Sequence, residues 1–239
     1  ERAAAEARLS LTLAQEAGDR HGEATCRHTL GVVAFRRADL DACAPELEEA
    51  LRIRREIGDR RGQASTLQAL GSLASRRGRP DEALATKEAA LSIWREVGER
   101  RGEAALLMNI GNELVALGRY EEGLRHLELA IARHHESGAT ANEAMALANL
   151  GHALEILGKP VSACVAWERA LRLFVDCGDA PGEITVRTML GAAIGQAVMD
   201  DLRLRHSPTI ITTHLGVLKG YAYRQQRVDN AAVEFDVAT

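Results

Sequence analysis

Two columns of glycine recur along this chain at intervals of 40 residues. One contains Gly18, Gly58, Gly98, Gly138 and Gly178, and the other contains Gly31, Gly71, Gly111, Gly151 and Gly191. An aliphatic residue precedes every glycine of the second column, and alanine-leucine or alanine-isoleucine pairs keep the same spacing. A fixed period of this length is typical of repeat architectures, in which each unit packs on its neighbours. The sequence therefore predicts a repeat array.

Each 40-residue unit is expected to form two helices, and residues 58–97 illustrate the pattern. Gly58 is free to adopt the left-handed conformation that ends a helix, and Asp59 is suited to cap the next one. Apolar residues then recur at spacings of three and four, which indicates an amphipathic helix. Gly78 ends that helix, and Pro80 begins the second one, where its missing N–H costs nothing. The expected fold class is all-α, built from antiparallel helix hairpins.

The second glycine column falls inside the first helix of each hairpin. Glycine within a helix costs about 1 kcal/mol relative to alanine. Its recurrence at one position predicts that a side chain there would clash with the neighbouring helix. Small residues in the second helices support this prediction, because they too permit close approach; they are Cys43, Ala83, Gly123 and Ala163.

The small and large positions resemble those of the tetratricopeptide repeat. In the third unit these positions are Leu107, Ile110, Gly111, Leu114, Gly123, Leu127 and Ala130. The stretch 58–62 (Gly-Asp-Arg-Arg-Gly) followed by Leu70-Gly71 looks like the long-repeat subgroup. That subgroup is found in kinesin light chains, in Leu-Gly-Asn-repeat polarity adaptors and in sensor regions of bacterial regulatory NTPases. The resemblance implies a right-handed superhelical solenoid.

The repeat pattern divides the chain into an array and a tail. The array, residues 1–199, is predicted to contain a half repeat at 1–17, full repeats at 18–57, 58–97, 98–137 and 138–177, and a half repeat at 178–199. Pro208 would break a helix in the next unit, and Leu218 stands where the glycine is expected. Residues 200–239 are therefore assigned to a divergent C-terminal cap or tail.

The resemblance also implies a binding site, because partner peptides lie along the concave face formed by the first helices. The expected groove residues are His28, Val32, Arg36, Gln68, Ser72, Arg76, Met108, Asn109, Asn112, Val115, Asn149, His152 and Glu155. Residues 109–112 come closest to the Asn-Leu-Gly-Asn signature, whose amides hold the backbone of an extended ligand. Two alternatives stay open for Arg36 and Arg76: a salt bridge on the groove wall, or recognition of an acidic segment.

Composition excludes several other classes of function. The net charge of −4 comes without a basic block, so no nucleic acid is expected as a partner. No apolar stretch reaches the roughly 20 residues needed to span a bilayer, and no signal peptide is present. The four cysteines show no CxxC pair. Reduced and mostly buried thiols in a cytoplasmic protein are therefore expected.

Motifs for catalysis or cofactors are absent from the sequence. Residues 158–160 (Gly-Lys-Pro) lack the glycine-rich cradle of a phosphate-binding loop. Residues 134–136 (His-His-Glu) are interpreted as a solvated helix surface, because adjacent helical residues point in different directions. We therefore expect no catalytic residue, no metal site, no cofactor and no enzymatic activity.

The leading hypothesis is a protein–protein interaction scaffold that binds a partner peptide or segment in the concave groove. The alternative is the sensor or autoinhibitory arm of a larger bacterial signalling NTPase or transcriptional regulator. The start at Glu1, within an expected helix, favours a fragment of a longer polypeptide, whose other domains would then be partners. A third hypothesis is a homo-oligomer formed through the ends of the array.

Overall fold

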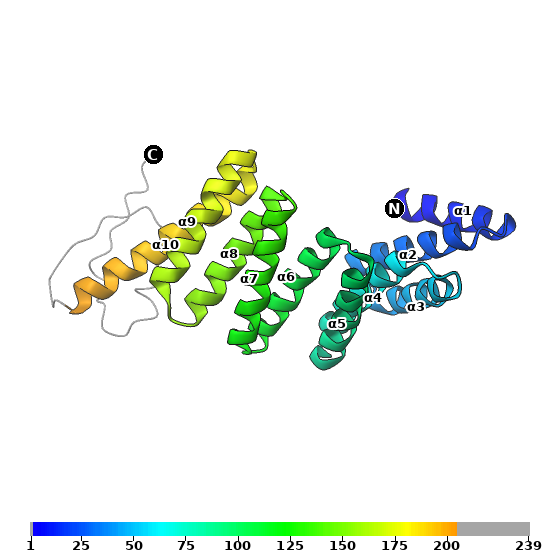
Figure 1. Cartoon of the computed structure of the whole chain (residues 1–239), viewed down its shortest axis with the longest axis horizontal. Coiled ribbons are helices and arrows are strands. Elements are labelled where there is room, and N and C mark those ends of the chain that lie inside the picture. Colours follow the sequence, from blue (N-terminus) through cyan, green and yellow to red (C-terminus); the bar gives the residue numbers. More distant parts are fainter. Residues whose placement is uncertain (1, 205–239) are drawn as a thin grey trace. The chain divides into compact units, whose positions relative to one another are not determined.

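The computed structural model describes residues 2–204, and within them the chain forms ten α-helices and no strand (Figure 1). The all-α prediction is confirmed. The helices are α1 (Arg2–Glu16), α2 (Arg20–Arg36), α3 (Leu40–Glu56), α4 (Arg60–Arg76), α5 (Pro80–Val97), α6 (Arg100–Ala116), α7 (Tyr120–Glu136), α8 (Thr140–Ile156), α9 (Pro160–Cys177) and α10 (Ala180–Leu204).

The helix boundaries follow the local signals in the sequence. The predicted hairpin in residues 58–97 is present as α4 and α5, and Pro80 is the first residue of α5. The Asp59 carboxylate accepts a hydrogen bond of 2.9 Å from the Gly62 N–H, so Asp59 caps α4. Asp19 caps α2 in the same way. These caps satisfy backbone donors that the first turn leaves without a helical partner.

The turns repeat every 20 residues with a left-handed backbone. At eight of these turns the residue is glycine, with φ between 65° and 76°, as at Gly58 and Gly78. The remaining turn has Ala38 at φ 61°, the one non-glycine residue with positive φ in the described chain. An L-residue pays a conformational cost there that glycine avoids.

The chain divides into two compact units, Glu1–Asn142 and Glu143–Thr239. In the first unit each helix from α1 to α6 packs against the helix that follows it. In addition, α2 contacts α4 and α4 contacts α6. The first helices of successive hairpins therefore lie side by side. In the second unit α9 packs against α10, and the Trp167 indole N–H donates to the Ala148 carbonyl of α8 at 3.1 Å.

The mid-helix glycines sit where the second helix comes closest. A Cβ placed on Gly31 would lie 2.6 Å from Leu47 Cγ, and one on Gly111 would lie 2.8 Å from Leu127 Cγ. The predicted clash is thus confirmed at Gly31, Gly71, Gly111 and Gly151, where the missing side chain leaves room for a large residue 16 positions later. At Gly71 the residue that fills this space is Lys87, whose Cγ would be 2.7 Å away.

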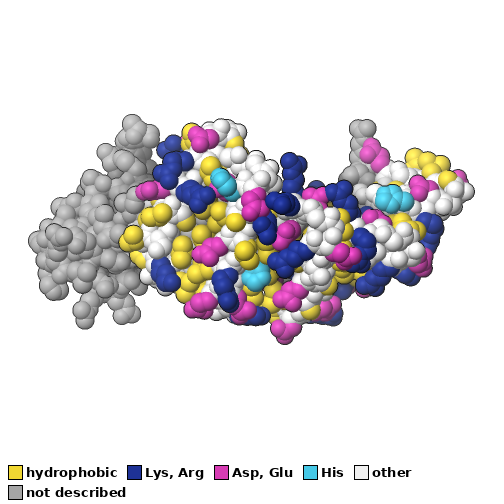
Figure 2. Space-filling view, viewed as in Figure 1, with side chains coloured by type: hydrophobic (Ala, Val, Ile, Leu, Met, Phe, Trp, Pro, Cys, Tyr) yellow, Lys and Arg dark blue, Asp and Glu magenta, His cyan; other side chains and the backbone are white. Residues whose placement is uncertain are grey.

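A ladder of ion pairs repeats at intervals of 40 residues. Arg20 pairs with Glu56 at 2.7 Å, Arg60 pairs with Glu96, and Arg100 pairs with Glu136 at 3.3 Å. Such exposed pairs each contribute about 1 kcal/mol or less. On the face shown in Figure 2, acidic and basic side chains are correspondingly intermixed.

Two minor predictions need correction. The solvated surface predicted for residues 134–136 is present at His135 and Glu136, which are exposed. His134 is 1% exposed, because it occupies a position that is aromatic 40 residues before and after, at Trp94 and Phe174. Among the cysteines Cys43 alone is buried, since Cys26 and Cys164 are half-buried and Cys177 is exposed. Among the described residues no three His, Cys, Asp or Glu side chains are grouped to hold a metal ion.

The end of the array remains a prediction. Helix α10 continues past residue 199 to Leu204, while Pro208 and Leu218 lie outside the described residues. A proline does not always end a helix in this chain, because Pro45 lies inside α3. Within residues 2–204, no helix is long and apolar enough to cross a membrane.

Candidate functional site

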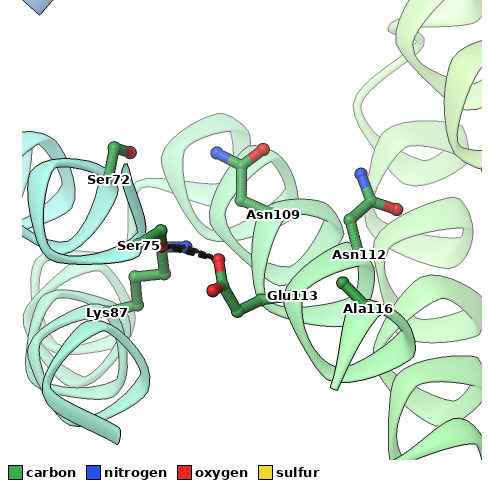
Figure 3. Close-up of a pocket in the computed structure, with 7 residues that line it drawn as sticks. All are labelled: Ser72, Ser75, Lys87, Asn109, Asn112, Glu113 and Ala116. Carbon is green, nitrogen blue, oxygen red and sulfur yellow. Dashed lines mark hydrogen bonds and ion pairs between the residues drawn. The ribbon is translucent and has the colours of Figure 1, made fainter. Parts of the chain in front are cut away.

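Two neighbouring cavities open along the first helices of the hairpins in the first unit. The polar cavity measures about 350 Å³ and is lined by Ser72, Ser75, Lys87, Asn109, Asn112, Glu113 and Ala116 (Figure 3). The apolar-floored cavity measures about 270 Å³ and is lined by His28, Val32, Phe35, Leu47, Ser65, Gln68, Ala69 and Ser72. Ser72 belongs to both, so the two cavities adjoin at α4.

A buried polar network forms one wall of the polar cavity. The Lys87 ammonium donates to Glu113 Oε2 at 2.7 Å and to Ser75 Oγ at 3.0 Å. The Ser75 hydroxyl lies 2.6 Å from the same Glu113 oxygen. The residue Lys87 is 3% exposed and the Glu113 side chain 17%. The network therefore joins α4, α5 and α6 across two successive repeats.

The charge state of this network follows from its contacts. Burial acts to raise the pKa of Glu113, but hydrogen bonds from Lys87 and Ser75 and the charge of Lys87 outweigh it. The pKa of Glu113 is lowered as a result, so the carboxylate is ionised at neutral pH. The positive charge of Lys87 is thereby compensated within the wall.

Sequence reasoning missed Lys87 and Glu113, although the repeat itself contained a signal. Both residues, together with Ser75, depart from positions that are apolar in the neighbouring repeats. The residues found 40 positions before and after are Leu47 and Leu127 for Lys87, Leu73 and Ala153 for Glu113, and Phe35 and Val115 for Ser75. Three such departures that meet in space mark a site whose composition is not dictated by packing.

The amides of Asn109 and Asn112 project from α6 beside this network (Figure 3). Asn109 is half-buried and Asn112 is exposed. Neither amide has a hydrogen-bond partner among the described residues, whereas the Ser72 hydroxyl donates to the Gln68 carbonyl at 3.1 Å. The cavity therefore presents two carboxamide groups that are available to a ligand.

The apolar-floored cavity contains a neutral histidine. His28 Nδ1 lies 3.4 Å from the Thr66 hydroxyl. Burial, reinforced by the positive charge of Arg54, lowers the pKa of His28 to about 4. Arg54 is itself buried and donates to the Gly62 carbonyl at 2.9 Å. His28 therefore contributes a polar but uncharged group at neutral pH.

Arg36 and Arg76 form no ion pair with any described residue, so the described part of the chain gives the salt-bridge alternative no support. The Arg76 guanidinium lies 4.5 Å from the centre of the Phe35 ring and donates to the Phe35 carbonyl at 3.2 Å. This cation–π contact holds Arg76 over Phe35, which is itself a lining residue of the apolar-floored cavity. Recognition of an acidic segment by Arg36 and Arg76 stays a prediction.

The remaining predicted groove residues lie in several different places. The predicted groove residues that line one or both cavities are His28, Val32, Gln68, Ser72, Asn109 and Asn112. Met108 and Val115 line neither cavity, and Val115 packs toward α7, because a Cβ on Gly123 would lie 2.7 Å from Val115 Cγ2. Asn149, His152 and Glu155 belong to the second unit, where His152 Nδ1 is 3.7 Å from a Glu155 oxygen.

Sequence comparison identifies the tetratricopeptide repeat in this chain. The family profile matches residues 33–96 and again residues 62–136. A different likeness extends over 49 residues, which are 53% identical to endonuclease MutS2 of Halothermothrix orenii. These residues are 20% of this chain and 6% of that enzyme, and the MutS2 protein of Symbiobacterium thermophilum gives a similar match at 49% identity.

Solved structures share the fold at low sequence identity. BtubC from P. vanneervenii is 20% identical with a TM-score of 0.65, over 89% of this chain and 94% of that one. A Signal Transduction ATPase with Numerous Domains from Pyrococcus horikoshii, which has a tetratricopeptide repeat sensor, is 16% identical with a TM-score of 0.67. That match covers 80% of this chain and 31% of the ATPase. A Rap protein complexed with Competence and Sporulation Factor is 16% identical with a TM-score of 0.62, over 78% of this chain and 51% of that one.

Proposed function

Because this chain is a tetratricopeptide repeat protein, we propose that it is a protein-interaction scaffold that acts by binding rather than by catalysis. The proposed ligand is an extended segment of a partner protein, held along α2, α4 and α6. The fold of the Rap protein, which was crystallised with a factor bound, is consistent with this role.

The unpartnered amides of Asn109 and Asn112 carry the proposal. A carboxamide offers both a donor and an acceptor, so it can bond to a peptide unit whatever side chain the ligand has there. Both amides line a cavity that adjoins a second one with an apolar floor. Backbone binding at the amides and side-chain burial in the cavities would together hold an extended peptide.

Selection of displayed random peptides on the purified protein tests this function. Synthetic copies of the selected peptides are then titrated against the wild type and against Asn112→Ala by fluorescence anisotropy. We expect the substitution to weaken binding by roughly three- to tenfold, as removal of one hydrogen-bonding group does at an interface. Circular dichroism is expected to show unchanged helicity, since Asn112 has no partner within the described chain.

Asn142→Ala supplies the matched control. It removes the same amide from an exposed position in the first turn of α8, which lines neither cavity. The control should bind like the wild type. An equal loss of peptide affinity in both variants would count against a groove at α2, α4 and α6. A loss of affinity in parallel with a loss of helicity would count against it too.

A second candidate function is that of the sensor arm of a larger regulator. It is compatible with the first candidate, because a sensor arm also binds a ligand. The fold similarity to the tetratricopeptide repeat sensor of the Pyrococcus ATPase supports it, and in that case the ligand would control an attached domain. Sequencing the gene around this segment decides the matter: a neighbouring coding region in frame without an NTPase or DNA-binding domain would eliminate it. The match to MutS2 covers 6% of that enzyme, too small a share to transfer its activity.

A further inference from the structure

The polar cavity is lined mainly by residues that have a hydrogen-bonding group in the side chain. Of its seven lining residues, Ala116 is the one without a polar side chain. Ser72 lies on the α4 side, Lys87 reaches in from α5, and Asn109, Asn112 and Glu113 come from α6 (Figure 3). A ligand group that enters this space therefore meets several hydrogen-bonding groups, together with the carbon atoms of the same side chains.

Several of these polar atoms have unused hydrogen-bonding capacity. An ammonium has three protons, and Lys87 has two acceptors, Ser75 and Glu113. On Glu113 the hydrogen bonds from Ser75 and Lys87 both reach Oε2, so Oε1 has no partner among the described residues. The amides of Asn109 and Asn112 add two further donor–acceptor groups. Donors and acceptors are thus both available in one cavity.

The cavity is nevertheless neutral overall. The charges of Lys87 and Glu113 cancel across 2.7 Å, and no other charged residue lines the cavity. A ligand carboxylate or ammonium would lose its hydration without meeting a net opposite charge. An apolar group would leave the amides and the ion pair without replacement for the water that it displaces.

We propose that the polar cavity recognises a carboxamide side chain, glutamine or asparagine, of the bound segment. This inference rests on the proposed function. A carboxamide is neutral and has two donors and an acceptor, so it matches the unused groups on both Lys87 and Glu113. The volume of about 350 Å³ also admits waters that bridge the amide to Asn109 and Asn112. The neighbouring apolar-floored cavity would take a different side chain of the same segment.

The test uses the peptides selected on the purified wild-type protein. Each glutamine or asparagine in a selected peptide is replaced in turn by its carboxylate counterpart and by methionine or alanine, and affinities are measured by fluorescence anisotropy. At one position we expect both replacements to weaken binding by roughly tenfold or more, because a site built for hydrogen bonds rejects groups that lack them. This part of the test needs no protein variant.

A protein variant then locates the effect. The double variant Lys87→Leu/Glu113→Leu has apolar residues at both positions, as the neighbouring repeats do. It should reverse the preference for a carboxamide, so that a peptide with methionine binds at least as well as one with glutamine. If this variant does not fold, Asn109→Leu replaces it, since the Asn109 side chain has no partner in the described chain. Glu88→Leu, at an exposed neighbour of Lys87 that lines neither cavity, serves as the control.

The outcomes separate this inference from the function on which it rests. Peptides that bind but contain no sensitive carboxamide would overturn the inference and leave the scaffold function intact. Tighter binding of the carboxylate counterpart would also overturn it, because the cavity would then act as a cationic site. If no peptide is selected, both the function and the inference fail.

Discussion

The ammonium group of Lys87 occupies a position where the neighbouring repeats bury Leu47 and Leu127. Removing this charge from water is costly, and Glu113 and Ser75 offset that cost with hydrogen bonds. A buried ion pair of this kind often adds little net stability, yet loss of one partner is expensive because the other is left unpaired. The two effects are separable by mutation.

Replacement of one partner is expected to destabilise the protein more than replacement of both. Lys87→Leu alone or Glu113→Leu alone should lower the free energy of unfolding by about 3 kcal/mol. The double variant should match the wild type or exceed its stability by about 1–4 kcal/mol. Urea unfolding followed by circular dichroism at pH 7 measures these differences.

Lys159→Leu is the matched control, because Lys159 is exposed and its side chain makes no cap hydrogen bond. Its effect should stay within about 0.5 kcal/mol. If the double variant lost as much stability as the two single variants together, the network would be a net stabilising element.

His28 makes the stability of the protein depend on pH in the mildly acidic range. Its folded-state pKa of about 4 lies below the ordinary value of 6.5, so between these values the unfolded chain binds more protons than the folded one. The stability tied to His28 is therefore complete above about pH 6.5 and decreases as the pH falls toward 4.

The variant His28→Gln should show a shallower loss of unfolding free energy between pH 6.5 and 4. Urea unfolding at several pH values measures the slope, and His21→Gln, at an exposed histidine, provides the control. The lowered pKa of Glu113 acts in a more acidic range, below the ordinary value of 4.5. An unchanged slope in His28→Gln would show that His28 does not titrate as its burial indicates.

At the scale of the helix, local signals account for nearly every boundary. Glycine with positive φ ends the helices, aspartate caps several of them, and Pro80 opens α5. The turn at Ala38 departs from this rule, since an alanine there holds the left-handed conformation. That turn should be the most easily improved connection in the array.

Ala38→Gly is expected to raise the free energy of unfolding by about 0.5–1 kcal/mol, because it removes the cost of a left-handed alanine. Gly78→Ala makes the reverse change at the equivalent turn and should lower it by about 1 kcal/mol. The comparison isolates the backbone cost, since a Cβ on Gly78 would meet no atom within 4 Å. Changes of the same sign in the two variants would contradict a conformational origin.

At the scale of the molecule, the site depends on contacts between repeats as well as within them. Lys87 and Glu113 are separated by 26 residues and belong to successive hairpins. Each hairpin supplies similar packing residues, so the shared fold alone does not fix a ligand. Where a ligand binds is determined by the few side chains that differ from copy to copy.

The 40-residue period was sufficient to predict the hairpins, the mid-helix glycines and the first-helix face, because turns, caps and amphipathic spacing are local properties of the chain. Asn109 and Asn112 entered the candidate site through the resemblance to the Asn-Leu-Gly-Asn signature, and the period alone did not single them out. The polar network could not be predicted in this way, since the pairing of Lys87 with Glu113 depends on how one hairpin packs against the next. The same holds for Arg76, which was expected either to pair with an acid or to recognise one, and which the tertiary structure places over Phe35.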